Sequence, residues 1–323
     1  MNLPADFIQT IHSAFGEKGE IFLKNLPDLV IDASARWGLT EIQPVLNLSF
    51  NFVAFAKHNH EDVILKIGVL NPELTSEMAA LKLFNGEGAC QLIEHDEGSG
   101  LLLLERLKPG KMLSELKDDD ERTHIAADLM QKIWRDINLE SDGPPSMQEH
   151  TLSGTRAPAF QKFIKLSDWF DGLRKIRPRF GGDTGPFPKK ILERVEDFLA
   201  ELFAEKDIKL IHGDFHHFNI LSSERGWLVI DPKGVIGPAG YEVGPFMINP
   251  WDSLSDERPF KVQAERRVSI LSERLGWERE KIIKWSTAHA VLSAWWCIED
   301  AQSEDNAGWE YSMWCAQMLS GLK

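Results

Sequence analysis

Residues 211–219 read IHGDFHHFN and place three histidines and one aspartate within nine positions. Histidine and aspartate are ligands of zinc and iron, so a metal site is the first interpretation. A helix that presents two ligands at i and i+4 is interrupted here by Gly213. This interruption weakens the metal interpretation. A metal-dependent hydrolase built on His212, His216 and His217 is kept as an alternative, and it would contain tightly bound zinc or iron.

The same stretch contains an acid and an amide at a spacing typical of phosphoryl transfer. Asn219 follows Asp214 by five residues, and a second acid, Asp231, ends the apolar run WLVID. Kinase catalytic loops carry D-x-x-x-x-N followed by a distant metal-binding aspartate. An aspartate can accept the proton of an attacking hydroxyl group, and carboxylate and amide oxygens suit Mg²⁺. The pattern predicts Asp214 as the catalytic residue and Asn219 and Asp231 as metal ligands.

Two longer segments around this loop resemble a known enzyme family. Residues 210–221, LIHGDFHHFNIL, and 227–244, WLVIDPKGVIGPAGYEVG, are similar to the aminoglycoside phosphotransferase-like kinases. Those kinases carry His-Gly-Asp where protein kinases carry His-Arg-Asp. The IDPKG and YEVG segments most resemble the branch of aminoglycoside/hydroxyurea antibiotic resistance kinases. By motif order the resemblance covers residues 40 to 300.

The resemblance implies an α+β fold of the bilobal, protein-kinase-like kind. Residues 1–107 are expected to form N-terminal helices and a small β-rich lobe that binds the nucleotide. Residues 108–323 are expected to form a larger, mainly helical lobe with the catalytic loop and the acceptor site. A chain of 323 residues is long enough for two such lobes.

Hydrophobic periodicity predicts the elements of both lobes. The N-terminal half should contain helices over 5–15 and 20–37, a β-hairpin over 44–70, a helix that begins at Pro72 after the N-cap Asn71, and two strands within 90–107. The second half should contain helices near 121–137, 190–206, 258–275, 279–298 and 307–321. The only strands expected in this half are NILSS and GWLVID, beside the catalytic loop.

Lys66 lies in the middle of the apolar run VILKIG and matches the lysine that contacts ATP phosphates in the family. A buried ammonium group needs a partner, because burying it unpaired is costly. The alternative is an edge strand with Lys66 on its solvent side. Glu73 and Glu77 lie four residues apart on the following helix, so either can reach Lys66. The resemblance favours Glu77, and Glu73 is interpreted as part of a solvated helix face.

The nucleotide loop departs from the protein-kinase pattern. No glycine occurs in LNLSFNFVAFA, residues 46–56, where protein kinases carry G-x-G-x-x-G. The hydroxyl group of Ser49 or nearby backbone amides are expected to cover the phosphates instead. Backbone groups of the hinge, including those of Glu105 and Leu107, are expected to bind the nucleotide base. Backbone recognition leaves the choice between ATP and GTP open.

Three further residues near the motif have less direct roles. His212 is interpreted as a structural brace of the catalytic loop. Glu242 is expected to fasten a loop by accepting backbone hydrogen bonds. Lys233 faces either phosphate or solvent, and the sequence favours neither.

The last long apolar helix ends in Glu299 and Asp300. Acidic side chains at a helix C-terminus oppose the macrodipole by roughly 0.3 to 1 kcal/mol each, and a cation would remove the conflict. The amino or guanidino group of an aminoglycoside would supply that cation, so both acids are candidate acceptor contacts. Trp295 and Trp296 either form flat walls for a sugar ring or belong to the core.

Composition limits the partners and the location. The 36 basic and 50 acidic residues give a net charge of −14, which disfavours nucleic acid and anionic membranes and allows a cationic substrate. No apolar run reaches the ~18 residues of a membrane-spanning helix, so a cytoplasmic protein is expected. The three widely separated cysteines are interpreted as buried thiols. The oligomeric state is left open.

The sequence as a whole predicts an ATP- and Mg²⁺-dependent O-phosphotransferase that acts on a hydroxyl group of a small molecule. The first candidate acceptor is an aminoglycoside such as streptomycin. One alternative keeps the fold and changes the acceptor to a sugar or an amino alcohol, because catalytic residues alone do not define the acceptor. Another alternative is a nucleotide-binding regulator without catalysis.

Overall fold

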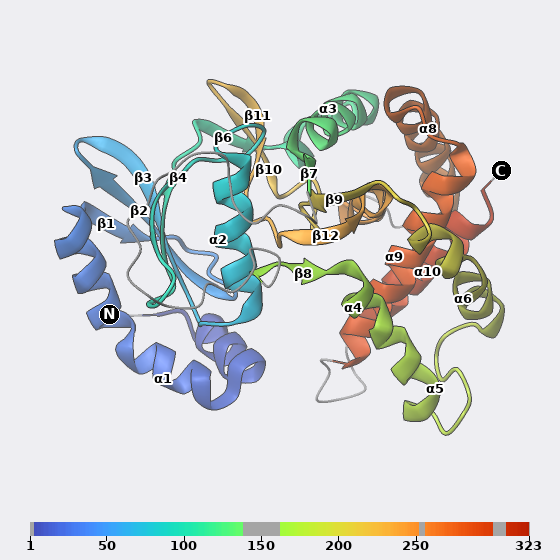
Figure 1. Ribbon diagram of the computed structural model, residues 1–323, viewed down its shortest axis with the longest axis horizontal. Coiled ribbons are helices and arrows are strands. Elements are labelled where there is room, and N and C mark those ends of the chain that lie inside the picture. Colours follow the sequence, from blue (N-terminus) through green and yellow to red (C-terminus); the bar gives the residue numbers. More distant parts are fainter. Residues whose placement is uncertain (1–2, 138–161, 252–255, 300–307, 323) are drawn as a thin grey trace.

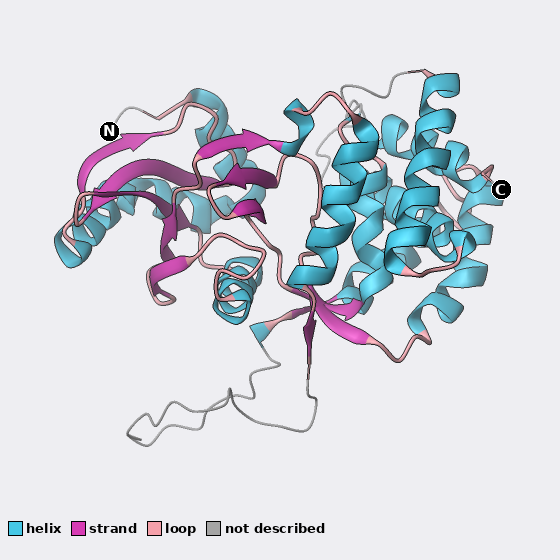
Figure 2. Ribbon diagram, turned by 90° about the horizontal axis from the view of Figure 1, so that it is seen from above, coloured by secondary structure: helices cyan, strands magenta, loops and turns pink. Residues whose placement is uncertain are grey.

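The computed structural model describes residues 3–137, 162–251, 256–299 and 308–322. A sheet and the N-terminal helix lie at one end of the molecule, and most other helices lie at the opposite end (Figure 1, Figure 2). The strands that flank the predicted catalytic loop lie between these two parts (Figure 1). The loop is therefore placed where the sheet-rich and helix-rich parts meet.

A five-stranded antiparallel sheet has the strand order β1-β2-β3-β5-β4. The strands are β1 (Thr40–Pro44), β2 (Asn51–His58), β3 (Glu61–Gly68), β4 (Leu92–Asp96) and β5 (Leu101–Glu105). Asn59 and His60 connect β2 to β3 with positive φ angles of 51° and 69°, as a two-residue hairpin turn with left-handed central residues requires. The predicted hairpin and the two strands predicted within 90–107 are confirmed.

The two faces of this sheet are buried against different helices. Leu101 belongs to a buried cluster that includes residues of α1 (Ala5–Trp37), whereas its neighbour Leu102 belongs to the cluster that includes α2 (Pro72–Phe84). This alternation is the two-residue period of a strand covered on both faces. Gly16 adopts a non-helical conformation inside α1, so the structure retains the two N-terminal helical segments that the sequence predicts.

The helix α2 begins as predicted. The side chain of Asn71 accepts a hydrogen bond from the backbone N–H of Leu74 at 2.9 Å, and Pro72 occupies the first turn. A side-chain N-cap satisfies one of the free N–H groups of the first turn and fixes where the helix starts. This start determines which face of α2 turns toward β3.

The remaining helices form the larger part around α9 (Arg279–Glu299), which packs against α6, α7, α8 and α10. Their bounds are α3 (Asp119–Ile133), α4 (Leu166–Asp171), α5 (Ile176–Arg179), α6 (Lys189–Phe203), α7 (Val243–Met247), α8 (Glu257–Leu275) and α10 (Gly308–Ser320). Trp285 and Trp295 of α9 are buried. The five helices predicted in this half are confirmed as α3, α6, α8, α9 and α10.

Two small sheets connect the parts, with the orders β11-β10-β6 and β7-β9-β12-β8. Their strands are β6 (Pro109–Met112), β7 (Arg135–Asp136), β8 (Ile164–Lys165), β9 (Ile208–Ile211), β10 (Ile220–Ser223), β11 (Gly226–Val229) and β12 (Val235–Pro238). The prediction that strands in this half are confined to the two segments now seen as β10 and β11 is wrong. The additional strands have two to four residues, and β6 and β12 contain Gly and Pro, which usually indicate turns.

Among the helices of the described residues, none is long and apolar enough to cross a membrane. The thiols of Cys90 and Cys315 are buried and that of Cys297 is half-buried, and none of the three forms a disulfide bond.

Candidate active site

His212 stands at the end of β9 and braces the catalytic loop. Its Nε2 donates to the carbonyl oxygen of Ile230 at 2.9 Å, and its Nδ1 accepts from the backbone N–H of Asp214 at 3.1 Å. This pattern needs a neutral ring, and burial lowers the pKa of His212 to about 4. The ring thus joins the loop to the segment before Asp231 through both of its nitrogens, in agreement with the predicted bracing role.

Glu242 fastens the same loop from the 3₁₀ turn η4 (Ala239–Glu242). Its carboxylate accepts backbone hydrogen bonds from His212 at 2.7 Å and from Gly213 at 2.9 Å. Gly213 has φ +86°, and an added Cβ there would lie 2.5 Å from the side chain of Val235. Glycine is therefore required at position 213. The two backbone hydrogen bonds to Glu242 agree with its predicted fastening role.

The pKa of Glu242 leads to a prediction about stability. Burial raises this pKa to about 7 from the ordinary 4.5, against the opposing effect of the two backbone donors. Between pH 4.5 and 7 the folded chain keeps a proton that the unfolded chain has lost, so this group's contribution to the free energy of unfolding falls as the pH rises. The total fall is on the order of 3 kcal/mol.

Urea unfolding of the wild-type and Glu242→Gln chains from pH 4.5 to 7.5 measures this effect. The difference between the two chains isolates Glu242 from His212 and His289, whose lowered pKa values of about 4 and about 3 change stability in the opposite direction. The wild-type free energy of unfolding, relative to that of the variant, should fall as the pH rises. A difference that is constant with pH would rule out a raised pKa for Glu242.

Asp214 retains access to solvent, since 40% of its side chain is exposed. Asn219 donates through Nδ2 to the backbone oxygen of Asp214 at 3.0 Å and to its Oδ2 at 3.3 Å, and His216 Nε2 lies 3.5 Å from Oδ1. Desolvation opposes ionisation, but nearby positive charge, above all that of His216 together with its hydrogen bond, outweighs it and holds the pKa of Asp214 well below its usual range. Asp214 is therefore an ionised acceptor at neutral pH.

The β10–β11 hairpin brings Asn219 and Asp231 together. The backbone oxygen of Asn219 accepts from the N–H of Ile230 at 2.9 Å, which makes Asp231 the next residue along the opposite strand. Asp231 has a left-handed φ of +56° and a half-exposed side chain. Because Nδ2 of Asn219 is directed at Asp214, its Oδ1 is the atom suited to a cation. One amide oxygen and one accessible carboxylate fit Mg²⁺, which is usually held by few protein ligands and by phosphates.

Lys66 lies on β3, between β2 and β5, and is 3% exposed. Its Nζ donates to Glu77 Oε1 at 2.6 Å and to Asp231 Oδ1 at 3.2 Å. Desolvation disfavours the ammonium, yet the charges of Asp231 and Glu77 raise the pKa of Lys66 above its usual value. The edge-strand alternative for Lys66 is wrong, and the preference for Glu77 over Glu73 as its partner agrees with the structure.

Breaking this buried pair should cost stability. The Lys66→Met chain leaves Glu77 buried without a cation, so its free energy of unfolding should fall by about 3 to 5 kcal/mol. The double variant Lys66→Met/Glu77→Leu removes both charges and should regain a large part of that loss. Urea unfolding at pH 7.5 measures both, and a double variant no more stable than the single one would contradict the pairing.

The helix α2 is also fastened to the segment after Asp231. Lys233 pairs with Glu73 at 2.9 Å, and Ser76 Oγ donates to the backbone oxygen of Gly234 at 2.5 Å. Glu73 is half-exposed, as expected of a solvated helix face, and it also forms this ion pair with Lys233. Lys233 faces a carboxylate, which neither of its two predicted environments included. The helix α2 thereby holds Lys233 and Gly234, just after the predicted metal ligand.

The other residues predicted to contact the nucleotide are Ser49, Glu105 and Leu107, and each has different surroundings. Ser49 is exposed in the connection between β1 and β2. Glu105 ends β5; its backbone N–H donates to Gln91, and its carboxylate pairs with Arg225. Leu107 is buried in the main core cluster. The backbone N–H and the carboxylate of Glu105 are thus engaged by protein groups, and the proposed contacts of the hinge with the nucleotide base and of Ser49 with phosphate stay predictions.

The residues predicted to contact the acceptor have different surroundings in the structure. Glu299 pairs with Lys175 at 2.6 Å, so the protein itself supplies the cation that the helix C-terminus was expected to need. Asp300 lies outside the described residues. Trp295 is 1% exposed and belongs to the core, so its interpretation as a wall is wrong. Trp296 is half-buried and packs edge-to-face on Trp169 of α4, with ring centroids 5.2 Å apart.

The histidines of the opening motif diverge instead of converging on a metal. The ring of His217 stacks on that of Phe246, with centroids 4.3 Å apart, beside Arg267. Both ring nitrogens of His212 are hydrogen-bonded to backbone groups. Within the described residues, no group of three His, Cys, Asp or Glu side chains is placed to hold a metal ion. The geometry does not support the metal-hydrolase alternative.

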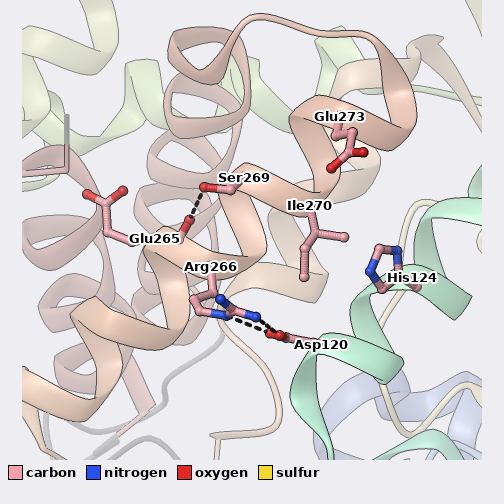
Figure 3. A pocket seen from close by; sticks show the side chains of 7 residues that line it. All are labelled: Asp120, His124, Glu265, Arg266, Ser269, Ile270 and Glu273. Carbon is pink, nitrogen blue, oxygen red and sulfur yellow. Dashed lines mark hydrogen bonds and ion pairs between the residues drawn. The ribbon is translucent and has the colours of Figure 1, made fainter.

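A separate pocket of about 420 Å³ opens between α3 and α8 (Figure 3). Asp120 and Arg266 form an ion pair across it, and His124 and Glu273 contribute to its lining (Figure 3). The predicted catalytic and metal-binding residues are not among those that line it. Its position therefore gives it no part in the site around Asp214.

Comparison with known proteins identifies the family. The sequence profile of the aminoglycoside/hydroxyurea antibiotic resistance kinases matches residues 36–147 and 155–301. The chain belongs to this family. It is therefore an enzyme, a phosphotransferase with a hydroxyl group as acceptor, and the resemblance inferred from the motifs is confirmed.

Curated relatives of this kinase family span nearly the whole chain. A streptomycin 6-kinase from Streptomyces glaucescens is 26% identical over 306 residues, which cover 94% of this chain and 93% of the relative. A hydroxyurea phosphotransferase from Kitasatospora aureofaciens is 28% identical over 309 residues, which cover 94% and 82%.

Solved structures confirm the predicted bilobal, protein-kinase-like α+β fold of this family member. The choline kinase LicA from Streptococcus pneumoniae has a TM-score of 0.57 at 14% identity and covers 91% of this chain and 99% of its own. The aminoglycoside phosphotransferase APH(4)-Ia, in a ternary complex with ADP and hygromycin B, has a TM-score of 0.55 at 11% identity, with 89% and 95% covered.

Two contacts of this kinase site were not predicted. His216 lies beside the Asp214 carboxylate, and Trp169 packs on the catalytic loop. The spacing of His216 within the motif was a signal for the first. Trp169 lies more than 40 residues before Asp214, in a short helix, and its sequence neighbours carry no such signal.

Proposed function

We propose that the chain transfers the γ-phosphoryl group of Mg·ATP to a hydroxyl group of a small cationic molecule, with an aminoglycoside such as streptomycin as the first candidate. The observation that carries the proposal is the 3.2 Å contact between Lys66 and Asp231, which joins the β3 lysine to the catalytic-loop hairpin. The predicted lobes, 1–107 and 108–323, would enclose the nucleotide between them.

Each residue has a role that follows from its surroundings. Lys66, held by Glu77, would donate to phosphate oxygens, and Asn219 and Asp231 would hold Mg²⁺. Bound Mg²⁺ would supply positive charge to the phosphates. Asp214 would orient the acceptor hydroxyl group and accept its proton as the bond to phosphorus forms. Its low pKa suits a loose transition state, in which orientation contributes more than strong basicity.

The proposed acceptor class has two supports. A streptomycin 6-kinase resembles this chain over most of its length, and the net charge of −14 favours a cation. We include Glu299 among the acceptor contacts, because an incoming cation can replace the exposed Lys175 beside it. Ser49 is proposed as a phosphate contact.

A screen of ADP release tests the proposal. Purified chain with Mg·ATP is mixed separately with streptomycin, a second aminoglycoside, hydroxyurea and choline, and ADP is followed in a coupled assay. Streptomycin should raise ADP release far above the acceptor-free rate, and omission of Mg²⁺ should abolish the increase. Strong turnover only with choline or hydroxyurea would refute the acceptor, and the absence of any acceptor-dependent ADP would refute the transferase activity on these compounds.

A further inference from the structure

The half-buried indole ring of Trp169 packs beside the residue that precedes Asp214, and the half-buried ring of Trp296 packs on that of Trp169. An added Cβ on Gly213 would lie 3.2 Å from Cη2 of Trp169, so the Trp169 ring packs directly on the residue that precedes Asp214. Trp296 of α9 meets Trp169 at an interplanar angle of 86°. The two rings form a right-angled corner, here called the indole corner, made of Trp169 and Trp296.

The indole corner is the exposed edge of a larger aromatic cluster. The ring centroids of Trp169 and Tyr241 lie 5.9 Å apart, and those of Trp296 and His289 lie 6.3 Å apart. Tyr241 and His289 are buried, hydrogen-bonded to each other at 2.9 Å, and both feel the negative charge of Asp214. The buried members fix the cluster in place, while Trp169 and Trp296 keep part of their surface in solvent.

The charges around the indole corner are mainly negative. Asp214 follows the glycine that Trp169 covers, Asp168 is exposed next to Trp169, and Glu299 lies one turn after Trp296 on α9. Lys175 and Glu299 pair with each other, and Lys233 pairs with Glu73, so the negative charge beside the corner comes mainly from Asp214 and Asp168. Aromatic faces attract cations through their quadrupole, and carboxylates close by strengthen that preference.

We infer that Trp169 and Trp296 bind the cationic part of the acceptor by stacking, and so select a guanidinium- or ammonium-bearing molecule while Asp214 holds its hydroxyl group. This inference rests on the proposed function and adds the residues that determine acceptor specificity. A cation–π contact with a partly desolvated indole contributes an effect of roughly 5- to 30-fold in affinity.

Kinetics of Trp169→Ala and Trp296→Ala with streptomycin test the inference. The KM for streptomycin should rise roughly 5- to 30-fold in each variant, and the KM for ATP should stay within about two-fold of the wild-type value. Trp169→Phe, which keeps an aromatic face and most of the packing, should show a smaller rise. Trp314→Ala is the matched control, because Trp314 is also half-buried in an edge-to-face contact, with Phe260.

Unchanged streptomycin KM in both alanine variants would overturn the inference and leave the proposed function intact. If the proposed function itself is wrong, the wild-type chain shows no Mg·ATP-dependent phosphate transfer. Calorimetric titration of streptomycin into each chain with Mg·ADP decides the inference in that case. Binding weakened in Trp169→Ala and Trp296→Ala, less weakened in Trp169→Phe and unchanged in Trp314→Ala would support it, and absent wild-type binding would overturn it.

Discussion

Replacement of Asp214 by asparagine should lower kcat by about 10²- to 10⁴-fold and leave the affinity for Mg·ATP within a few-fold of the wild-type value. The carboxylate is the proposed proton acceptor, and an amide cannot take that proton. Asparagine keeps the size of the side chain and an oxygen that can accept from Asn219. The loop should therefore remain folded, and the loss should lie in the chemical step.

Steady-state kinetics and calorimetric titration of Mg·ATP separate the two effects. Asp207→Asn is a suitable control, because Asp207 is an exposed aspartate that pairs with Lys209 of β9, the strand that leads into the loop. If the Asp214→Asn chain keeps more than half of the wild-type kcat, Asp214 is not the proton acceptor. A kcat loss accompanied by an equal loss of nucleotide affinity would indicate a folding defect instead.

Replacement of Asp231 by alanine should weaken the use of Mg·ATP by 10- to 100-fold or more. Loss of groups that merely orient metal ligands already has effects of that size, and Asp231 is the only charged ligand proposed for Mg²⁺. The change also removes one of the two carboxylates that hold the Lys66 ammonium. Asn219→Ala should have a smaller effect in the same direction, because the amide is neutral.

The dependence of rate on Mg²⁺ concentration measures both variants. The concentration for half-maximal activity should rise in each, and more in Asp231→Ala. Glu73→Gln provides the comparison, since Glu73 fastens the same segment through Lys233 without a proposed metal contact. Unchanged Mg²⁺ dependence in both ligand variants would contradict the assignment.

The parts of the fold that the sequence predicted depend on local signals. The five long helices carry apolar residues at helical spacing, and the β2–β3 hairpin carries alternating residues around a polar turn. The catalytic loop is equally local, because Asp214 and Asn219 lie five residues apart and the hairpin after them sets Asp231 nearby. The burial of Lys66 followed from apolar neighbours on both sides.

The features that the sequence did not predict depend on contacts between distant segments. Glu73 and Lys233 are 160 residues apart, and their pairing follows from how α2 packs on the segment after Asp231. The short strands β9 and β12 pair with each other and with β7 and β8 of the same sheet, and four residues each are too few to distinguish them by pattern alone. Local propensity is a weak guide to such strands, since their stability comes from neighbours.

Phosphorus NMR of a reaction with Mg·ATP and streptomycin tests most directly whether the site at Asp214, Asn219, Asp231 and Lys66 transfers phosphate to a hydroxyl group. The expected result is a new phosphomonoester signal that grows in equal amount with ADP and is absent when EDTA removes Mg²⁺. ADP that forms together with inorganic phosphate but no phosphomonoester, or a phosphomonoester that forms at full rate in EDTA, would contradict the account.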